Sequence, residues 1–200
     1  MEEARIDLRL SGVSRASGGM YQNVVMEGVS RVVGDIVCED CKWDGVTTID
    51  GSITAKTLTA KGKSDIRGDV RGEVIRLEGY MKIGGLCDAE KFVGMGAFTI
   101  EGLLNAGDIS LQVYGPTRIH EIGAETIRVQ RESGRSLFGR LKTLTADIIE
   151  GDEIYLEYTK ARAVRGNKVT LGAGCNIDVV EYRAEFEQHA KAHIGTQKKL

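Results

Sequence analysis

Polar and apolar residues alternate with a period of two along the middle of the chain. Between residues 53 and 83, with one slip at each of two places, one set of alternate positions holds no charged residue and the other set holds every charge. This alternation indicates extended chain with one side buried, because a helix would place charges in both sets. Strands are typically about 3 to 10 residues long. The chain must therefore bend repeatedly while it keeps the same side inward.

A four-residue motif recurs where the alternation slips: a small or apolar residue, two polar residues and a larger apolar residue. Copies read CEDC (38–41), AKTL (55–58), VIRL (74–77), AEKF (89–92), AGDI (106–109) and AETI (124–127). The spacing is close to 17 residues, and counting back from Cys41 leads to another alternation that starts at Val24. A short fixed period with buried alternate positions is typical of a solenoid. We predict an all-β fold, a parallel β-solenoid of about nine coils with roughly 17 residues each.

The pattern divides the chain into three parts. Residues 1–22 show no clear coil and are expected to be a flexible N-terminal segment, whereas 23–180 form the β-helix. Residues 181–200 form a C-terminal tail. A short helix is expected within this tail, because Tyr182 and Phe186 would share one helical face.

One long interval between motifs contains an insertion near 131–143, with the sequence RESGRSLFGRLKT. Insertions between repeats usually form loops on the outside of a solenoid. Its basic residues are Arg131, Arg135, Arg140 and Lys142. This loop is a candidate contact for an acidic partner or a lipid surface, and the alternative is a solvated loop without a partner.

The composition excludes several classes of protein. Glycine is abundant, with 26 residues, but the single proline excludes collagen and proline-rich linkers. A formal net charge of −2 argues against general nucleic-acid binding, so no nucleic-acid partner is expected. The first ten residues carry charges where a signal peptide needs an apolar run, and no apolar run is long enough to span a membrane. We expect a cytoplasmic protein with reduced thiols.

The sequence offers few groups for chemistry. Cys38 and Cys41 have the spacing of half a zinc site or a redox pair, but they occupy the slots of Ala55 and Leu58, which predicts that they point inward as small apolar residues. Cys87 and Cys175 also fall on inward positions. His189 and His193 lack an evident third ligand. We therefore predict no catalytic, cofactor-binding or metal-binding residues, and no cofactor.

The run VTTIDGSITAKTLTAKGKSDIRGDVRGEVIRLEGYMKIGGLCDAEKFVGMGAFTIEGLLNAGDI resembles a bactofilin domain, a family of polymer-forming bacterial cytoskeletal proteins. The motifs that carry the resemblance are IDG (49–51), IEG (100–102) and the small inward residues between them. The resemblance covers residues 41–113 well and extends weakly to about 180. It implies a right-handed, triangular β-helix. It also implies nucleotide-independent filaments that scaffold envelope, cell-shape or motility machinery, often at the membrane.

Solenoid ends expose strand edges and a cut through the core, which predicts end-to-end assembly with further copies or a paralogue. The candidate polymer interface comprises Val24, Val25, Met26, Val169, Leu171, Ile177, Val179 and Val180. Leu86 and Leu103 lie one period apart on the outer side and form a candidate lateral contact. Contact with the membrane periphery or with an envelope protein is a further candidate.

Two alternatives remain. Hexapeptide-repeat acyltransferases also have parallel β-solenoids, and His120 would be the candidate general base of such an enzyme. The other alternative is a scaffold module that does not polymerise. We favour the structural, non-enzymatic function.

Overall fold

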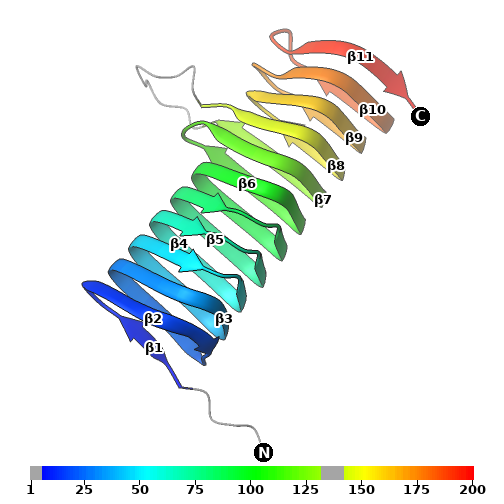
Figure 1. Ribbon diagram of the computed structural model, residues 1–200. Coiled ribbons are helices and arrows are strands. Elements are labelled where there is room, and N and C mark those ends of the chain that lie inside the picture. Colours follow the sequence, from blue (N-terminus) through cyan, green and yellow to red (C-terminus); the bar gives the residue numbers. More distant parts are fainter. Residues whose placement is uncertain (1–5, 132–141) are drawn as a thin grey trace, which may run out of the picture.

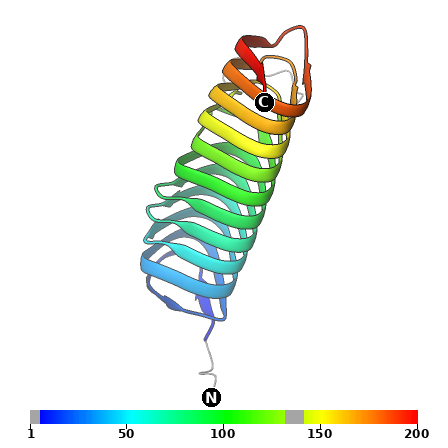
Figure 2. The ribbon, with the colours of Figure 1, turned by 90° about the vertical axis from the view of Figure 1, so that its right-hand side faces the viewer.

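The computed structural model describes residues 6–131 and 142–200, which wind into a parallel β-solenoid of about 11 turns of about 17 residues (Figures 1 and 2). Its strands are β1 (Leu8–Leu10), β2 (Val13–Met20), β3 (Asn23–Asp50), β4 (Ile53–Ile66), β5 (Val70–Ile83), β6 (Cys87–Val113), β7 (Thr117–Arg131), β8 (Leu144–Leu156), β9 (Thr159–Leu171), β10 (Asn176–Gln188) and β11 (His193–Lys199). All strand pairs are parallel, and the order along the stack follows the chain. The predicted fold class is confirmed, with about two turns more than predicted.

Successive turns of the N-terminal half lie in strict register. Ile36 is opposite Ile53, Ile53 is opposite Val70, and Val70 is opposite Cys87, so each step is one period of 17 residues. The predicted motif at 74–77 is wrong by two residues, because Ile75 is the residue opposite Leu58. The small residue of that corner is Gly72, so this turn is as regular as its neighbours.

Inward positions form one continuous core along the axis. Trp43, Phe92 and Phe98 are its largest fully buried side chains, and the two phenylalanine rings meet edge to face at 6.4 Å. The indole N–H of Trp43 donates a 2.7 Å hydrogen bond to the buried hydroxyl of Ser64. Because the polar atoms of both side chains are satisfied, the aromatic ring contributes its apolar area without leaving a buried polar group unpaired.

One corner of the N-terminal turns is built by a column of glycines with positive φ. Its members are Gly12, Gly28, Gly45, Gly62, Gly79 and Gly96, with φ between 67° and 150°. A Cβ on Gly62 would lie 2.2 Å from the carbonyl oxygen of Gly45 in the turn below. Only glycine permits both this backbone conformation and this close approach between turns.

The chain ends differ from the expected flexible segment and helical tail. Residues 8–20 form β1 and β2 and complete a further turn, because Leu8 and Leu10 pack over Val24 and Met26. Residues 1–5 lie outside the described residues. The predicted helix within 181–200 is wrong, since β10 continues to Gln188 and β11 follows it.

Tyr182 and Phe186 explain why the tail resembles a helix in sequence. An interval of four residues fits one helical face, but it also fits one side of a strand. The register shifts between Tyr182 and Glu185, and the two rings lie 5.3 Å apart against the core. The apolar spacing therefore reflects a strand with an irregularity and not a helix.

The interval near residue 131 contains the expected insertion: Thr117 pairs with Leu144, ten positions beyond the usual 17. Arg135 and Arg140 lie outside the described residues. Lys142 is only 8% exposed, so its assignment to a solvent-facing loop is wrong. It continues the buried alternate positions of β8, with Leu144 and Ala146.

Candidate assembly surfaces

The N-terminal end of the solenoid is formed by β1 and β2, which within residues 6–131 and 142–200 have a parallel partner, β3, on one side only. Leu8 and Leu10 are half-buried at this end. Val24, Val25 and Met26 were predicted here, but they pair with residues 8–10 and lie one turn further in. The terminal position of these residues was therefore wrong, because the alternation in 8–20 is weakly apolar and escaped the sequence pattern.

The C-terminal end is formed mainly by β11, which pairs only with β10. Ile177 lies opposite Ile194, and Val179 lies opposite Thr196, so the predicted interface residues at this end are covered by a further turn. Val169, Leu171, Ile177 and Val180 are buried in the core. Their assignment to the end surface was wrong, because β11 is mostly polar and its sequence does not show a coil.

The two ends differ in chemistry. The last turn presents Gln197 and Lys199 above Val180 and Tyr182, and the amide of Gln197 donates a 3.3 Å hydrogen bond to the Tyr182 hydroxyl. The first turn presents Leu8 and Leu10 above Val24 and Met26. The N-terminal end is therefore the more apolar of the two.

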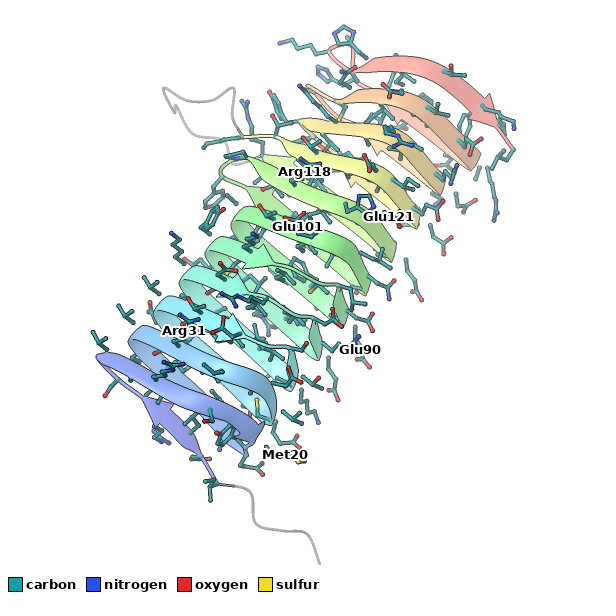
Figure 3. All side chains as sticks on the ribbon, viewed as in Figure 1. Met20, Arg31, Glu90, Glu101, Arg118 and Glu121 are labelled. Atoms are coloured by element: carbon teal, nitrogen blue, oxygen red, sulfur yellow. The ribbon has the colours of Figure 1, made fainter. Side chains whose placement is uncertain are left out.

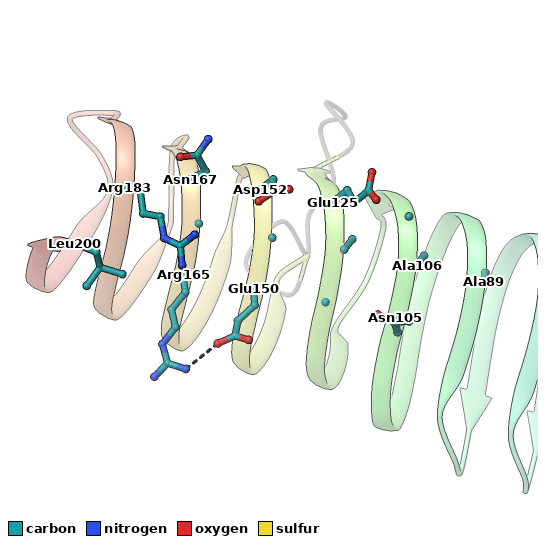
Figure 4. A pocket seen from close by; sticks show the side chains of 15 residues that line it. Ala89, Asn105, Ala106, Glu125, Glu150, Asp152, Arg165, Asn167, Arg183 and Leu200 are labelled. Carbon is teal, nitrogen blue, oxygen red and sulfur yellow. Dashed lines mark hydrogen bonds and ion pairs between the residues drawn. The ribbon is translucent and has the colours of Figure 1, made fainter.

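A groove of about 650 Å³ follows one corner of the C-terminal turns (Figure 4). Its floor is made by small residues at the first position of the repeated motif, including Ala106, Ala124, Gly151 and Gly166. Sequence reasoning missed this groove, although the small residues were visible in the motif. These positions carry only a methyl group or a hydrogen atom, which leaves room for the groove.

Charged side chains form a ladder beside this groove. Arg165 donates hydrogen bonds of 2.8 Å to Glu150 in the preceding turn and to Glu181 in the following turn. The bond to Glu150, and then the bond to Glu181, raise the pKa of Arg165. Lys198 extends the ladder, 4.0 Å from Glu181. Alternating charges therefore connect four successive turns on one face.

The base of the insertion is fixed by an aromatic contact. The guanidinium of Arg131 lies 3.6 Å from the centre of the Tyr158 ring, a cation–π geometry. The backbone N–H of Arg131 donates to Glu157 at 3.3 Å. Of the four basic residues predicted as a partner loop, Arg131 thus belongs to the wall of the solenoid.

Leu86 and Leu103 lie in neighbouring turns, where the N–H of Gly102 bonds to the carbonyl oxygen of Gly85 at 3.1 Å. Leu103 is 39% exposed and Leu86 is half-buried. The same column continues through Glu121, Ile148, Ala163 and Val179. The structure therefore places Val179 on the outer side of the stack, in line with the candidate lateral contact.

All four cysteines are buried and free. A hydrogen bond with Cys41 lowers the pKa of Cys38, and the same bond together with burial raises the pKa of Cys41. Burial raises the pKa of Cys87, and raises that of Cys175 to about 11. Within the described residues, no group of three or more His, Cys, Asp or Glu side chains is arranged to hold a metal ion.

The histidines are exposed or lie in connections. His120 is half-exposed on β7, with its Nδ1 atom 3.1 Å from Asp147 and its Nε2 atom 3.8 Å from Glu121. His189 accepts a 3.0 Å hydrogen bond from the backbone N–H of Lys191 between β10 and β11. His193 begins β11, so the two histidines do not share a helical face. Among the described residues, no helix has the length and apolar character of a membrane span.

Comparison with known proteins identifies two relatives. The chain is 34% identical to the uncharacterized protein YhbE of Bacillus subtilis, over 96% of this chain and 98% of YhbE. It is 44% identical to the uncharacterized protein YhbF of the same organism, over 50% of this chain and 42% of YhbF. No family model and no solved structure matches. Because the similarity to YhbE extends over nearly the whole of both chains, the protein belongs to the same family as YhbE.

Proposed function

We propose that the protein is a structural subunit that assembles end to end into nucleotide-independent filaments. The observation that carries this proposal is the pair of open ends: β1 and β2 at one end and β11 at the other have a parallel partner on one side only. Each end presents backbone N–H and C=O groups in the geometry that another turn would use. A second copy is a natural occupant, because it carries strands of the same spacing and direction.

The energetics favour such stacking. Each additional backbone hydrogen bond contributes about 0.5–1.5 kcal/mol net. The half-buried Leu8 and Leu10 would lose their remaining contact with water, and full burial of a leucine side chain is worth roughly 1.5–3 kcal/mol. The loss of translational and rotational freedom, about 4–15 kcal/mol, opposes this gain. Several strand pairs per junction are therefore needed, and β1, β2 and β11 supply them.

The resemblance of residues 41–113 to bactofilins supports the same function. In this proposal the filament is a cytoplasmic scaffold for bacterial envelope or motility machinery, and it requires no cofactor. YhbE and YhbF occur in one organism, which supports a paralogue as a second possible subunit. Contact with the membrane periphery is part of the proposal and would use surfaces other than the two ends.

The test uses the purified full chain without nucleotide, examined by sedimentation and negative-stain electron microscopy. We expect filaments, and we expect added ATP or GTP to leave their amount unchanged. Leu10→Asp at the N-terminal end and Ile194→Asp at the C-terminal end should each give short soluble species, because a carboxylate would face the next subunit. Thr54→Asp, on an exposed position of a central turn, is the matched control.

Circular dichroism must show that each variant keeps its β-structure. Filaments of unchanged length in both end variants would contradict the proposal, and so would a wild-type chain that remains monomeric at high concentration.

A further inference from the structure

Exposed apolar side chains follow the glycine corner of the N-terminal half. With Lys63 and Ala97 they form a column that we name the corner stripe: Val13, Val29, Val46, Lys63, Tyr80, Ala97 and Tyr114. All of these residues except Tyr114, which follows Val113, stand directly after a glycine of that corner. Val13 is 89% exposed, and Val29, Val46, Tyr80 and Tyr114 are each between 41% and 49% exposed. Five large apolar residues aligned in this way on seven turns are typical of a contact surface and not of scattered exposure.

Two columns of polar residues border the corner stripe. The leading flank lies two positions before it and comprises Glu27, Asp44, Lys61 and Glu78. The trailing flank lies two positions after it and comprises Arg31, Thr48, Asp65 and Lys82. All eight residues are exposed or partly exposed, and Arg31 marks the trailing flank in Figure 3.

The charges of the two flanks are opposite within each turn that carries charge on both sides. Glu27 is matched by Arg31, and Glu78 is matched by Lys82. In the turn between them both signs are reversed, with Lys61 on the leading flank and Asp65 on the trailing flank. Arg31 pairs with Asp50 at 2.6 Å and Lys61 pairs with Glu78 at 3.0 Å within the chain, whereas Glu27, Asp65 and Lys82 make no ion pair with another described side chain. Their charges are therefore available to an approaching surface.

This arrangement is complementary to a second copy that is packed parallel and in register. When two copies face each other across a two-fold axis parallel to the solenoid axis, each leading flank meets the trailing flank of the other copy at the same level. Glu27 then faces Arg31, Lys61 faces Asp65 and Glu78 faces Lys82, each pair occurring twice. In the antiparallel arrangement centred on Lys63 each flank meets itself, and Asp44 faces Glu78. Facing like charges destabilise that antiparallel register.

We propose that the corner stripe is a lateral docking surface for a second copy of this chain, packed parallel and in register. The spacing of turns, about 4.8 Å, is identical in both copies, so contacts made in one turn recur in the next. Lys63 faces its own equivalent at the centre of the stripe, which opposes pairing. Its long aliphatic stem allows the ammonium group to reach toward Asp65 of either copy.

The interface is too small to hold two single chains together. Seven turns span roughly 30 Å, and a strip about 10 Å wide gives on the order of 300 Å² per copy, below the 800 Å² of a stable interface. In a filament the same contact recurs in every subunit, and linked weak contacts add. The inference therefore rests on the proposed end-to-end assembly and predicts that lateral pairing appears together with filaments.

The test is disulfide cross-linking of the assembled full chain with Val29→Cys. A two-fold axis places position 29 opposite itself in the parallel arrangement, so Val29→Cys should form disulfide dimers at least about fivefold faster than Thr54→Cys, an exposed control in another column. The wild-type chain is the second control, because its four cysteines are at most 5% exposed. In the antiparallel arrangement centred on Lys63 position 29 meets position 97, and only a mixture of Val29→Cys with Ala97→Cys would cross-link.

Equal rates for Val29→Cys and Thr54→Cys, or cross-linking only in the mixture, would overturn the inference. Sedimentation of the same samples separates this result from failure of the proposed function. Filaments without cross-links contradict lateral pairing alone, whereas cross-links in a chain that does not sediment contradict end-to-end assembly.

Charge reversal provides an independent readout in the Val29→Cys background. Glu78→Lys and Lys82→Glu should each reduce the cross-linking rate about threefold, because each places like charges face to face. The double variant should restore the rate, since the two flanks again carry opposite signs. Two single variants without effect, or a double variant no faster than either of them, would overturn the in-register arrangement.

Discussion

The N-terminal and C-terminal halves of the solenoid hold the same fold by different means. From β3 to β6 the turns have constant length, and backbone meets backbone at the glycine corner. From β7 to β11 the turn length varies, and the positive-φ glycine column ends at Gly96. There the side chains of Arg131 and Arg165 connect neighbouring turns through Tyr158, Glu150 and Glu181.

A second corner shows the same contrast. In the N-terminal half Asp35 accepts from the N–H of Ser52 at 2.7 Å, and Asp69 accepts from the N–H of Leu86 at 3.0 Å. Further along the same column the residues are apolar except for Glu121, from Leu103 through Ile148 and Ala163 to Val179. Constant backbone contacts require constant turn length, whereas side-chain contacts tolerate insertions. This difference explains how a turn with ten extra residues is accommodated only in the second half.

Gly62→Val should reduce the free energy of unfolding more than any of the other substitutions below. The substitution places a β-branched side chain at φ 98° and a Cβ 2.2 Å from a carbonyl oxygen, so we expect a loss of about 3 kcal/mol or more in the free energy of unfolding. Gly123→Ala is the matched control in the C-terminal half, because its Cβ would meet nothing closer than 3.6 Å. That variant should change stability by less than about 1 kcal/mol. Urea unfolding followed by circular dichroism measures both values, and similar losses would show that the two halves do not differ in this respect.

The hydrogen bond between Asp69 and the N–H of Leu86 should give the next largest effect on stability. Asp69→Ala removes the acceptor for the N–H of Leu86, and we expect a loss of about 1–2 kcal/mol, because an unpaired backbone donor remains at a partly buried corner. Asp65→Ala is the control, since Asp65 is exposed and makes no ion pair with another described residue. Its effect should stay within about 0.5 kcal/mol. Equal losses in urea unfolding for Asp69→Ala and Asp65→Ala would mean that the hydrogen bond to Leu86 contributes nothing beyond surface charge.

The regular half is also the half that the sequence predicted best. Between residues 41 and 113 the inward positions, the period and the fold class all follow from alternation, because one constant turn length repeats the same buried slots. The corner at Ile75 was placed two residues late, since Val74, Ile75 and Leu77 are all apolar and periodicity alone could not choose among them. The register of this segment depends on which residue occupies the small position of the corner, and here that residue is Gly72.

The ends could not be predicted for a different reason. β2 and β11 are strands because a neighbouring turn supplies their hydrogen-bond partners, and their own sequences are small or polar. Residues such as Thr196 and Lys198 have no apolar alternation to reveal the strand. The candidate polymer interface was consequently placed one turn too far inward at both ends. The corner stripe was missed because alternation shows that these valines face outward but does not show that they align from turn to turn.

The charge ladder of the C-terminal half should contribute a smaller and salt-dependent effect. Arg165→Met keeps the aliphatic stem but removes the bonds to Glu150 and Glu181, and because Arg165 is about half-exposed we expect a loss of only about 0.5–1 kcal/mol. The loss should shrink in 1 M salt, where charges are screened over about 3 Å. Thermal unfolding at low and high salt gives this comparison. An effect that is independent of salt would indicate packing by the guanidinium instead of charge pairing.

The reactivity of the native cysteines compares the two halves without any substitution. The pKa of Cys38 in the N-terminal half is lowered by its hydrogen bond with Cys41, whereas burial raises the pKa of Cys175 in the C-terminal half to about 11. Alkylation requires the thiolate, so at pH 8 Cys38 should react before the other three thiols in the folded chain. Cys175 should become reactive only as the pH approaches 11.

A folded-state pKa raised above the ordinary value also has a consequence for stability. The neutral thiol of Cys175 contributes fully below the unfolded-state pKa near 9, and this contribution is lost as the pH rises from there through about 11. The pH at which Cys175 becomes labelled should therefore coincide with a fall in the thermal midpoint. Mass spectrometry of peptides alkylated at pH 8, 9, 10 and 11 measures the pH at which Cys175 becomes labelled. Labelling of Cys175 as fast as Cys38 at pH 8 would mean that the C-terminal turns open readily, and that side-chain contacts close the solenoid less tightly than the glycine corner does.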